Sequence, residues 1–154
     1  MNSDTPGSTA RIAGYPILRT LAAFPIACFS GALATDIAYA GTADMLWADF
    51  SAWLLAVGMI MGGLATMVGI VDFVVDRTLR AHRALWPVMI GSLLVLILGL
   101  FNNFVHSRDA WTSVVPLGLE LSAATVVVML ITIWFASATT YRRDVSMQYS
   151  GVRQ

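Results

Sequence analysis

Four apolar segments, each about as long as a bilayer is thick, constrain this 154-residue chain more than any other feature. At about 1.5 Å per residue, each segment would form a helix of ~28 Å or more, close to the ~30 Å hydrocarbon core of a membrane. Because lipid offers no hydrogen-bond partners, backbone N–H and C=O groups must pair within their own segment, which favours helices. The sequence therefore predicts an all-α fold, an integral membrane four-helix bundle with short loops. The predicted spans are residues 17–40, 50–73, 87–105 and 114–136.

The overall composition supports a membrane protein rather than a large soluble domain. Hydrophobic residues make up 58% of the chain and charged residues only 12%, whereas about a quarter of the residues in soluble domains are charged. The formal net charge is zero, so we expect no nucleic-acid partner. The single cysteine, Cys28, lies inside the first apolar segment, where a thiol usually acts as a small buried hydrophobe.

The polar ends of the chain set the predicted domain limits. Residues 1–14 and 147–154 are rich in small and polar side chains, so we predict mobile tails there. Between them, residues 15–146 form a single predicted transmembrane domain, with no loop long enough to fold separately.

The distribution of arginine predicts the orientation in the membrane. The connection between the second and third spans and the two ends together carry eight arginines, whereas the first connection has none and the third has only Arg108. The eight are Arg11, Arg19, Arg77, Arg80, Arg83, Arg142, Arg143 and Arg153. Because positive charge is retained on the cytoplasmic side, we predict a bacterial cytoplasmic (inner) membrane protein with both termini cytoplasmic. In the alternative, the first segment is a signal peptide cleaved after Ala38-Tyr39-Ala40, leaving three spans.

Small residues predict how the helices pack. Gly58, Gly62 and Thr66 recur every four residues in the second span, and Gly69 follows Gly62 by seven. Such stripes let helix backbones approach closely in lipid. We predict packing of this stripe against the first span, and the alternative is a homodimer formed through the same stripe.

Polar residues within the spans mark a candidate site, because a charged side chain in the centre of a bilayer costs about 2.5–3.5 kcal/mol on insertion scales. Five such residues fall in the predicted outer half of the bundle: Asp36, Asn102, Asn103, His106 and Glu120. They have two interpretations: a polar site for a proton, cation or quinone headgroup, or a set of hydrogen bonds that holds the helices together. Glu120 is the deepest of the five on this prediction.

At the predicted cytoplasmic ends of the spans, Arg19 and Asp72 are at similar depths and are predicted to form a structural ion pair. The two histidines, His82 and His106, flank the same span and would lie ~36 Å apart along a continuous helix. They cannot ligate one haem iron together, and one cysteine with two distant histidines does not make a zinc site. The sequence predicts no cofactor, no metal site and no catalytic residues.

Several short motifs resemble an uncharacterised bacterial family of small membrane proteins known as domain of unknown function 2231. The resemblance covers residues 15–146, and the run from Asn103 to Thr112 is its most specific part. The other matching motifs are Tyr15-Pro16-Ile17, Phe24-Pro25-Ile26, Asp36, Gly69-Ile70-Val71-Asp72, Pro116 and Tyr141-Arg142-Arg143-Asp144-Val145. The resemblance implies a four-span bundle and brings no established activity with it.

The chain also departs from the family pattern. Where relatives typically read His-Pro-x-His-Pro, this chain has Tyr15-Pro16 and Arg19-Thr20, and Arg143 replaces a histidine of the tail motif. If those histidines bind metal or haem in relatives, the resemblance implies that this chain has lost that capacity. Glu120 is a peculiarity of this chain or of a subgroup.

Two functional hypotheses follow from the sequence. The first is a non-catalytic accessory or scaffold subunit in contact with the lipid bilayer and with a membrane or periplasmic protein partner. The second is a redox or ion-handling membrane module with a quinone or proton site in the outer half of the bundle. A transporter or channel is the weakest idea, since the inner halves of the spans offer few polar groups.

Overall fold

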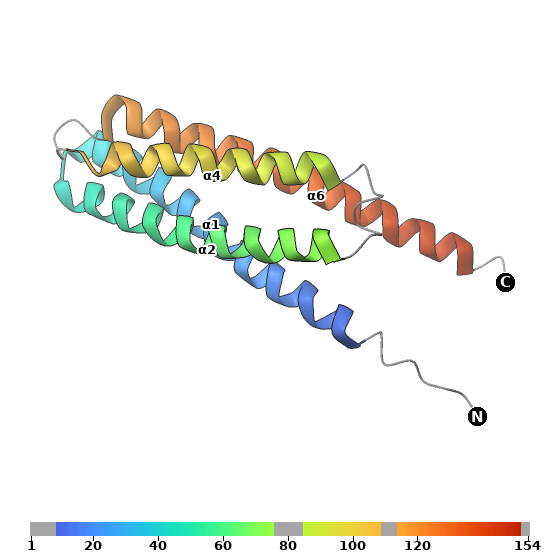
Figure 1. Ribbon diagram of the computed structural model, residues 1–154. Helices are drawn as coiled ribbons and strands as arrows, with labels where there is room; N and C mark the ends of the chain where they lie inside the picture. The colour runs from blue at the N-terminus through green and yellow to red at the C-terminus, as the bar shows by residue number, and fades with distance from the viewer. Residues whose placement is uncertain (1–8, 76–84, 109–113, 152–154) are drawn as a thin grey trace.

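The chain folds as a bundle of long, roughly antiparallel helices (Figure 1). A computed structural model describes residues 9–75, 85–108 and 114–151, and the side chains of residues 18, 20–75, 85–108 and 114–138. The long helices are α1 (Thr9–Thr42), α2 (Met45–Val75), α4 (Trp86–His106) and α6 (Leu119–Gly151). A π-helical turn, η2 (Val114–Gly118), leads directly into α6. Both ends of the chain lie at one end of the bundle, and we call the opposite end, which carries the α1–α2 turn, the turn end (Figure 1).

Within the described residues, four segments are long and apolar enough to cross a membrane: Thr20–Thr42, Met45–Val75, Trp86–His106 and Val114–Ala138. The prediction of an all-α bundle with four candidate spans is therefore confirmed. Two helices extend beyond the predicted transmembrane domain, because α1 already begins at Thr9 and α6 continues to Gly151. The predicted tails are helical over residues 9–14 and 147–151, and their remaining residues lie outside the described part of the chain.

The turn between α1 and α2 is short because its local hydrogen bonds end one helix and begin the next. Ala43 has a positive φ of 55°, and its N–H donates to the carbonyl oxygen of Tyr39 at 2.7 Å. Asp44 then caps α2, since its Oδ1 accepts a hydrogen bond from the backbone N–H of Leu46 at 3.0 Å. A carboxylate in this position satisfies a free N–H and complements the positive end of the helix dipole.

The η2 turn brings α6 back against the bundle. Val115 has extended backbone angles, φ −116° and ψ 130°, as expected for a residue that precedes a proline. The Val115–Pro116 peptide bond is cis. Val114 is fully buried and packs with Tyr39 and Ala48 in a small hydrophobic cluster at the turn end.

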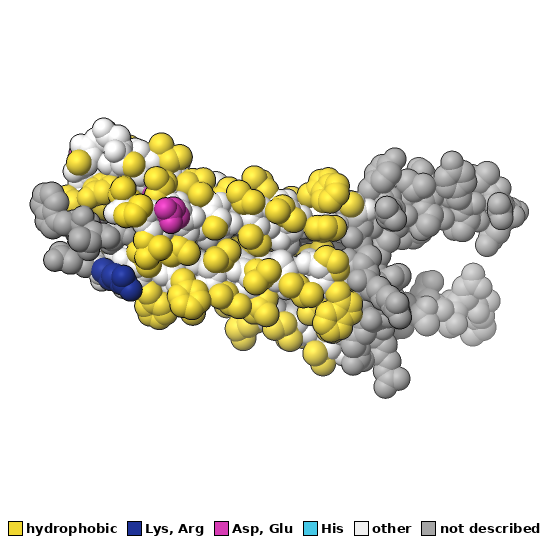
Figure 2. Space-filling model, turned by 90° about the horizontal axis from the view of Figure 1, so that it is seen from above, with side chains coloured by type: hydrophobic (Ala, Val, Ile, Leu, Met, Phe, Trp, Pro, Cys, Tyr) yellow, Lys and Arg dark blue, Asp and Glu magenta, His cyan; other side chains and the backbone are white. Residues whose placement is uncertain are grey.

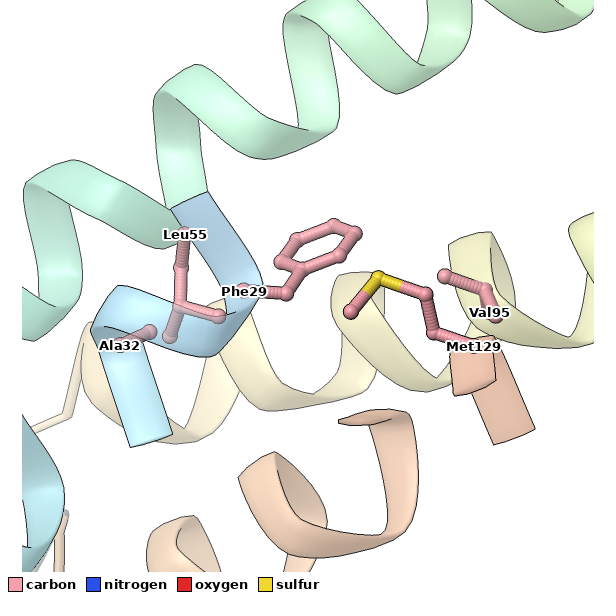
Figure 3. Close-up of a cluster of buried hydrophobic side chains, with 5 residues drawn as sticks. All are labelled: Phe29, Ala32, Leu55, Val95 and Met129. Carbon is pink, nitrogen blue, oxygen red and sulfur yellow. The ribbon is translucent and has the colours of Figure 1, made fainter. Parts of the chain in front are cut away.

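The main hydrophobic core lies between all four long helices. Phe29 and Ala32 of α1 pack with Leu55 of α2, Val95 of α4 and Met129 of α6 (Figure 3). Most large apolar side chains instead point outward, including Trp53, which is 74% exposed, and Trp134, which is 67% exposed. Figure 2 shows one such face, on which hydrophobic side chains predominate and charged side chains are rare. An apolar exterior of this extent suits contact with lipid.

Two of the four residues in the predicted packing stripe lie in close contact with neighbouring helices. A Cβ atom added at Gly58 would be 2.8 Å from Cε1 of Phe29, and one added at Gly62 would be 2.9 Å from Cδ2 of Leu96. Thr66 donates a hydrogen bond to the carbonyl oxygen of Gly62, whereas a Cβ atom at Gly69 would meet nothing within 4 Å. In this structure Gly58 and Gly62 therefore face α1 and α4 of the same chain.

Candidate functional site: a buried polar cluster

The turn end of the bundle encloses five polar side chains that come from all four long helices. They are Asp36 of α1, Ser51 of α2, Asn102 and His106 of α4, and Ser122 of α6. Asp36, Ser51 and Asn102 have no exposed surface, Ser122 is 1% exposed and His106 is 7% exposed. We call this set the Asp36 cluster. Because these groups are removed from solvent, their hydrogen bonds must be made with one another or with other buried groups of the protein.

Asp36 is the centre of the cluster. Its Oδ1 accepts a hydrogen bond from the Ser51 hydroxyl at 2.5 Å and lies 3.0 Å from Nε2 of His106. Its Oδ2 accepts a hydrogen bond from the Ser122 hydroxyl at 2.5 Å. The carboxyl group of α1 is thus joined to each of the other three long helices.

Hydrogen bonds from Asn102 and Thr35 hold Ser122 and Ser51 in place beside the carboxyl group. The side-chain amide of Asn102 donates from Nδ2 to Oγ of Ser122 at 2.7 Å. On the other side, Oγ1 of Thr35 lies 2.6 Å from Oγ of Ser51, and Thr35 is also within reach of the carbonyl oxygens of Gly31 and Ala32. With the Ser122 hydrogen directed at Asp36, two hydrogen bonds are aligned in one chain, from the Asn102 amide to the Ser122 hydroxyl and from that hydroxyl to the carboxyl oxygen. Such chains strengthen their own members in a medium of low dielectric constant.

The protonation pattern of His106 follows from its two neighbours. Its Nδ1 lies 3.0 Å from the backbone carbonyl oxygen of Asn102, which can only accept, so Nδ1 carries a hydrogen. In a neutral imidazole, Nε2 would then be an acceptor facing an oxygen of Asp36. A hydrogen bond between Nε2 and Oδ1 therefore needs one further proton, held either by the imidazole or by the carboxyl group.

One acceptor in the cluster lacks a partner. Oδ1 of Asn102 is buried and makes no hydrogen bond within the described structure. An unsatisfied buried acceptor costs about 1–3 kcal/mol, and in native proteins such an atom is commonly satisfied by an internal water molecule. The cluster can therefore accept one further hydrogen bond, at Oδ1 of Asn102, from a small donor.

The structure brings together three of the five polar residues singled out from the sequence: Asp36, Asn102 and His106. Asn103 is half-buried and Glu120 is exposed. Glu120 precedes Ser122 by two residues, which rotates it by ~200° about the helix axis. It therefore points away from the cluster, although both residues belong to the first turn of α6.

Ser51 and Ser122 were not among the predicted site residues, because the prediction was based only on ionisable groups and side-chain amides. The spacing of these serines along their helices could have identified them as buried residues. Ser51, Leu55 and Gly58 lie on the buried face of α2, and Ser122 with Thr125 belongs to the buried face of α6. Small hydroxyl residues at intervals of three or four mark faces where helices in a membrane pack and hydrogen bond.

The structure leaves the ion pair predicted at the other end of the bundle untested. Asp72 is half-buried near the end of α2, whereas the side chain of Arg19 and the whole of His82 lie outside the described residues. Among the side chains that are described, no group of three or more His, Cys, Asp and Glu residues could hold a metal ion.

The fold and its apolar exterior define a class, a helical membrane protein with four candidate spans. Comparison with protein families makes this assignment more specific. The family model described as "Predicted membrane protein (DUF2231)" matches residues 14–149. The chain belongs to this family, as its resemblance in sequence suggested. No curated protein and no solved structure matches the chain.

Proposed function

We propose that this protein is a non-catalytic accessory or scaffold subunit of a membrane assembly. One observation carries the proposal: Asp36 joins α1 to α2, α4 and α6 through buried hydrogen bonds. The polar groups of the spans are used to fix the helices relative to one another. A bundle held in this way presents a stable apolar exterior on which a partner helix can pack.

Capture from native membranes tests the accessory role. The tagged full-length protein should be extracted in a mild detergent and analysed by mass spectrometry beside two variants. One is Asp36→Ala, which we expect to destabilise the bundle, and the other is Asp49→Ala, an exposed control. The proposal expects one protein recovered in constant ratio with the wild type and with Asp49→Ala, and less of it with Asp36→Ala. Recovery of the protein alone from several gentle detergents, with no membrane activity lost on deletion of its gene, would contradict the accessory role.

We further propose that the protein resides in a bacterial inner membrane with both termini in the cytoplasm. The eight arginines of the terminal segments and the α2–α4 connection support this orientation. It places the turn end, with the Asp36 cluster, on the outer side. A reporter fused after Gln154 should then be active in the cytoplasm, and one inserted after Gly41 only in the periplasm. The reverse pattern would refute this orientation.

A second candidate function is an ion-handling or redox module. The pairing of Asp36 with His106 favours it, because these two groups hold one proton between them in a buried position. Within this candidate the arrangement suits a proton better than a quinone headgroup, since all members of the cluster are at least nine-tenths buried. An ion flux or redox activity lost in Asp36→Asn and retained in Glu120→Ala would support this candidate, and equal activity of the two variants would oppose it.

A further inference from the structure

We propose that Asp36 and His106 form a buried binding site for one exchangeable proton, which is taken up from the aqueous phase at the turn end. This inference deepens the second candidate function by naming its ligand and the atoms that hold it. It does not depend on a partner protein. The pairing spans 70 residues of sequence and links α1 to α4.

The proton has two bonded positions in the pair. In one, an imidazolium donates from Nε2 of His106 to a carboxylate oxygen of Asp36. In the other, the carboxyl group carries the proton on Oδ1 and donates it to a neutral imidazole. Both arrangements keep Nδ1 protonated toward the Asn102 carbonyl oxygen, and both leave the pair without net charge. A neutral pair is the form best suited to a membrane interior.

Release of this proton to water has a defined structural consequence. The pair then has one negative charge, and Nε2 of His106 and Oδ1 of Asp36 become two acceptors facing each other at 3.0 Å. That contact is no longer a hydrogen bond, so the link between α1 and α4 is lost. The links from Ser51 and Ser122 to Asp36 remain, because both hydroxyls donate to the carboxylate.

The unpartnered oxygen of Asn102 is an independent sign that the cluster takes a small donor. Asn102 is completely buried, its Nδ2 is used by Ser122, and its Oδ1 has no partner among the described groups. A water molecule donating to this oxygen would extend the chain that runs from Asn102 through Ser122 to Oδ2 of Asp36. Such a molecule supplies the mobile hydrogen bonds through which a proton reaches a buried group.

The other titratable and charged side chains at the turn end leave the pair as the principal buried site among the described residues. On α1, Tyr39 is buried in the neighbouring apolar cluster. The remaining groups are Asp44 before α2, Asp49 on α2, Arg108 after α4 and Glu120 on α6, all exposed. Among the described residues of this end, three exposed acids outnumber one base, which favours the arrival of protons here.

Nitrogen NMR of the imidazole tests the proposal directly. The full-length protein would be labelled with ¹⁵N-histidine and ¹³C-aspartate and placed in lipid vesicles. His82→Asn leaves His106 as the one reporting histidine, and Asp36→Asn identifies the Asp36 carboxyl signal. Between about pH 5 and pH 9, which brackets the range in which histidine ordinarily changes its charge, Nδ1 should stay protonated. As the pH rises, the pair should lose one proton in a single step, seen either at Nε2 of His106 or in the ¹³C signal of the Asp36 carboxyl group.

Two results would overturn the proposal. One is that neither the Nε2 signal of His106 nor the carboxyl signal of Asp36 changes throughout this range, which would mean that the proton does not exchange. The other is a neutral imidazole protonated on Nε2, which would contradict the assigned tautomer. Either result leaves the accessory role untouched, whereas failure to capture a partner leaves the proton site untouched.

Stability measurements separate a proton site from a purely structural hydrogen bond. In His106→Gln, the side-chain amide can still donate to Asp36 but does not titrate. The wild type should exceed this variant in unfolding free energy at low pH, and the difference should shrink as the pH rises and the pair loses its proton. Glu120→Gln, altered at an exposed acid of the same end, should show no such trend. A difference between wild type and His106→Gln that is constant with pH would refute exchange.

Discussion

Replacement of Asp36 by alanine should destabilise the bundle more than any other change of one acidic residue. The substitution removes the acceptor for Ser51, Ser122 and His106 together. Hydrogen bonds between membrane helices contribute on average about 0.6 kcal/mol and at most about 1.7 kcal/mol. Three of them give a loss between about 2 and about 5 kcal/mol. A similar range, about 3–5 kcal/mol, is typical when one partner of a buried charged pair is removed.

An opposing effect has to be considered, because the same substitution also removes a costly buried carboxyl group. Replacement of a whole buried polar network by apolar residues is often neutral. Asp36→Ala does not achieve this, since it leaves the Ser122 hydroxyl and the His106 imidazole buried without that acceptor, and such orphaned groups cost about 1–3 kcal/mol each. The Ser51 hydroxyl is less affected, because it also lies 3.3 Å from the carbonyl oxygen of Ala32. The net effect should therefore be a loss of stability.

The unfolding equilibrium can be followed by tryptophan fluorescence as sodium dodecyl sulfate is added to mixed micelles. A loss of about 2–5 kcal/mol corresponds to a shift of the folding equilibrium by roughly 30-fold to several thousandfold. Asp49→Ala is the matched control, because Asp49 is an exposed acid near the same end, and it should change stability by no more than about 0.5 kcal/mol. A loss in Asp36→Ala no larger than that of the control would refute the reasoning.

Two further predictions use matched pairs of substitutions in α2, read out by the same unfolding assay. Gly58→Ala should lower the unfolding free energy by about 1–3 kcal/mol through overpacking, because the new Cβ would lie 2.8 Å from Phe29. Gly69→Ala should be neutral or raise it by up to about 1 kcal/mol, because nothing lies within 4 Å of a Cβ there. Equal effects of the two alanines would argue against the close approach of α1 and α2. Asp44→Ala should lower the unfolding free energy by about 0.5–2 kcal/mol, because it removes the cap of α2, whereas Asp49→Ala should leave it nearly unchanged. An Asp44→Ala variant as stable as the wild type would show that the cap contributes nothing.

The sequence was sufficient to predict the fold because the requirement for backbone pairing in lipid leaves few choices for long apolar segments. The lengths of α1 and α6 were underestimated, since hydropathy ends where the apolar segment ends while a helix can continue into polar residues. Asp36 and His106 were recognised for a related reason. An ionisable group in a span is costly, so it draws attention wherever it occurs.

The inward face of each helix was harder to predict. In α6, valine, leucine and methionine occur on all sides, because lipid and the protein core are equally apolar environments. Hydropathy therefore does not indicate that Ser122 points inward and Glu120 outward. A serine is also easily overlooked, since its hydroxyl is commonly satisfied by the backbone of its own helix, whereas here it joins two helices.

The coupling free energy between Asp36 and His106 tests the central claim most directly. A double-mutant cycle with Asp36→Asn and His106→Gln, measured in lipid bicelles at neutral pH, compares the two single variants with the double variant. Direct contact across α1 and α4 predicts a coupling of about 0.5–3 kcal/mol. Effects that simply add, to within about 0.3 kcal/mol, would show that the two side chains do not meet and that the Asp36 cluster does not exist in the membrane.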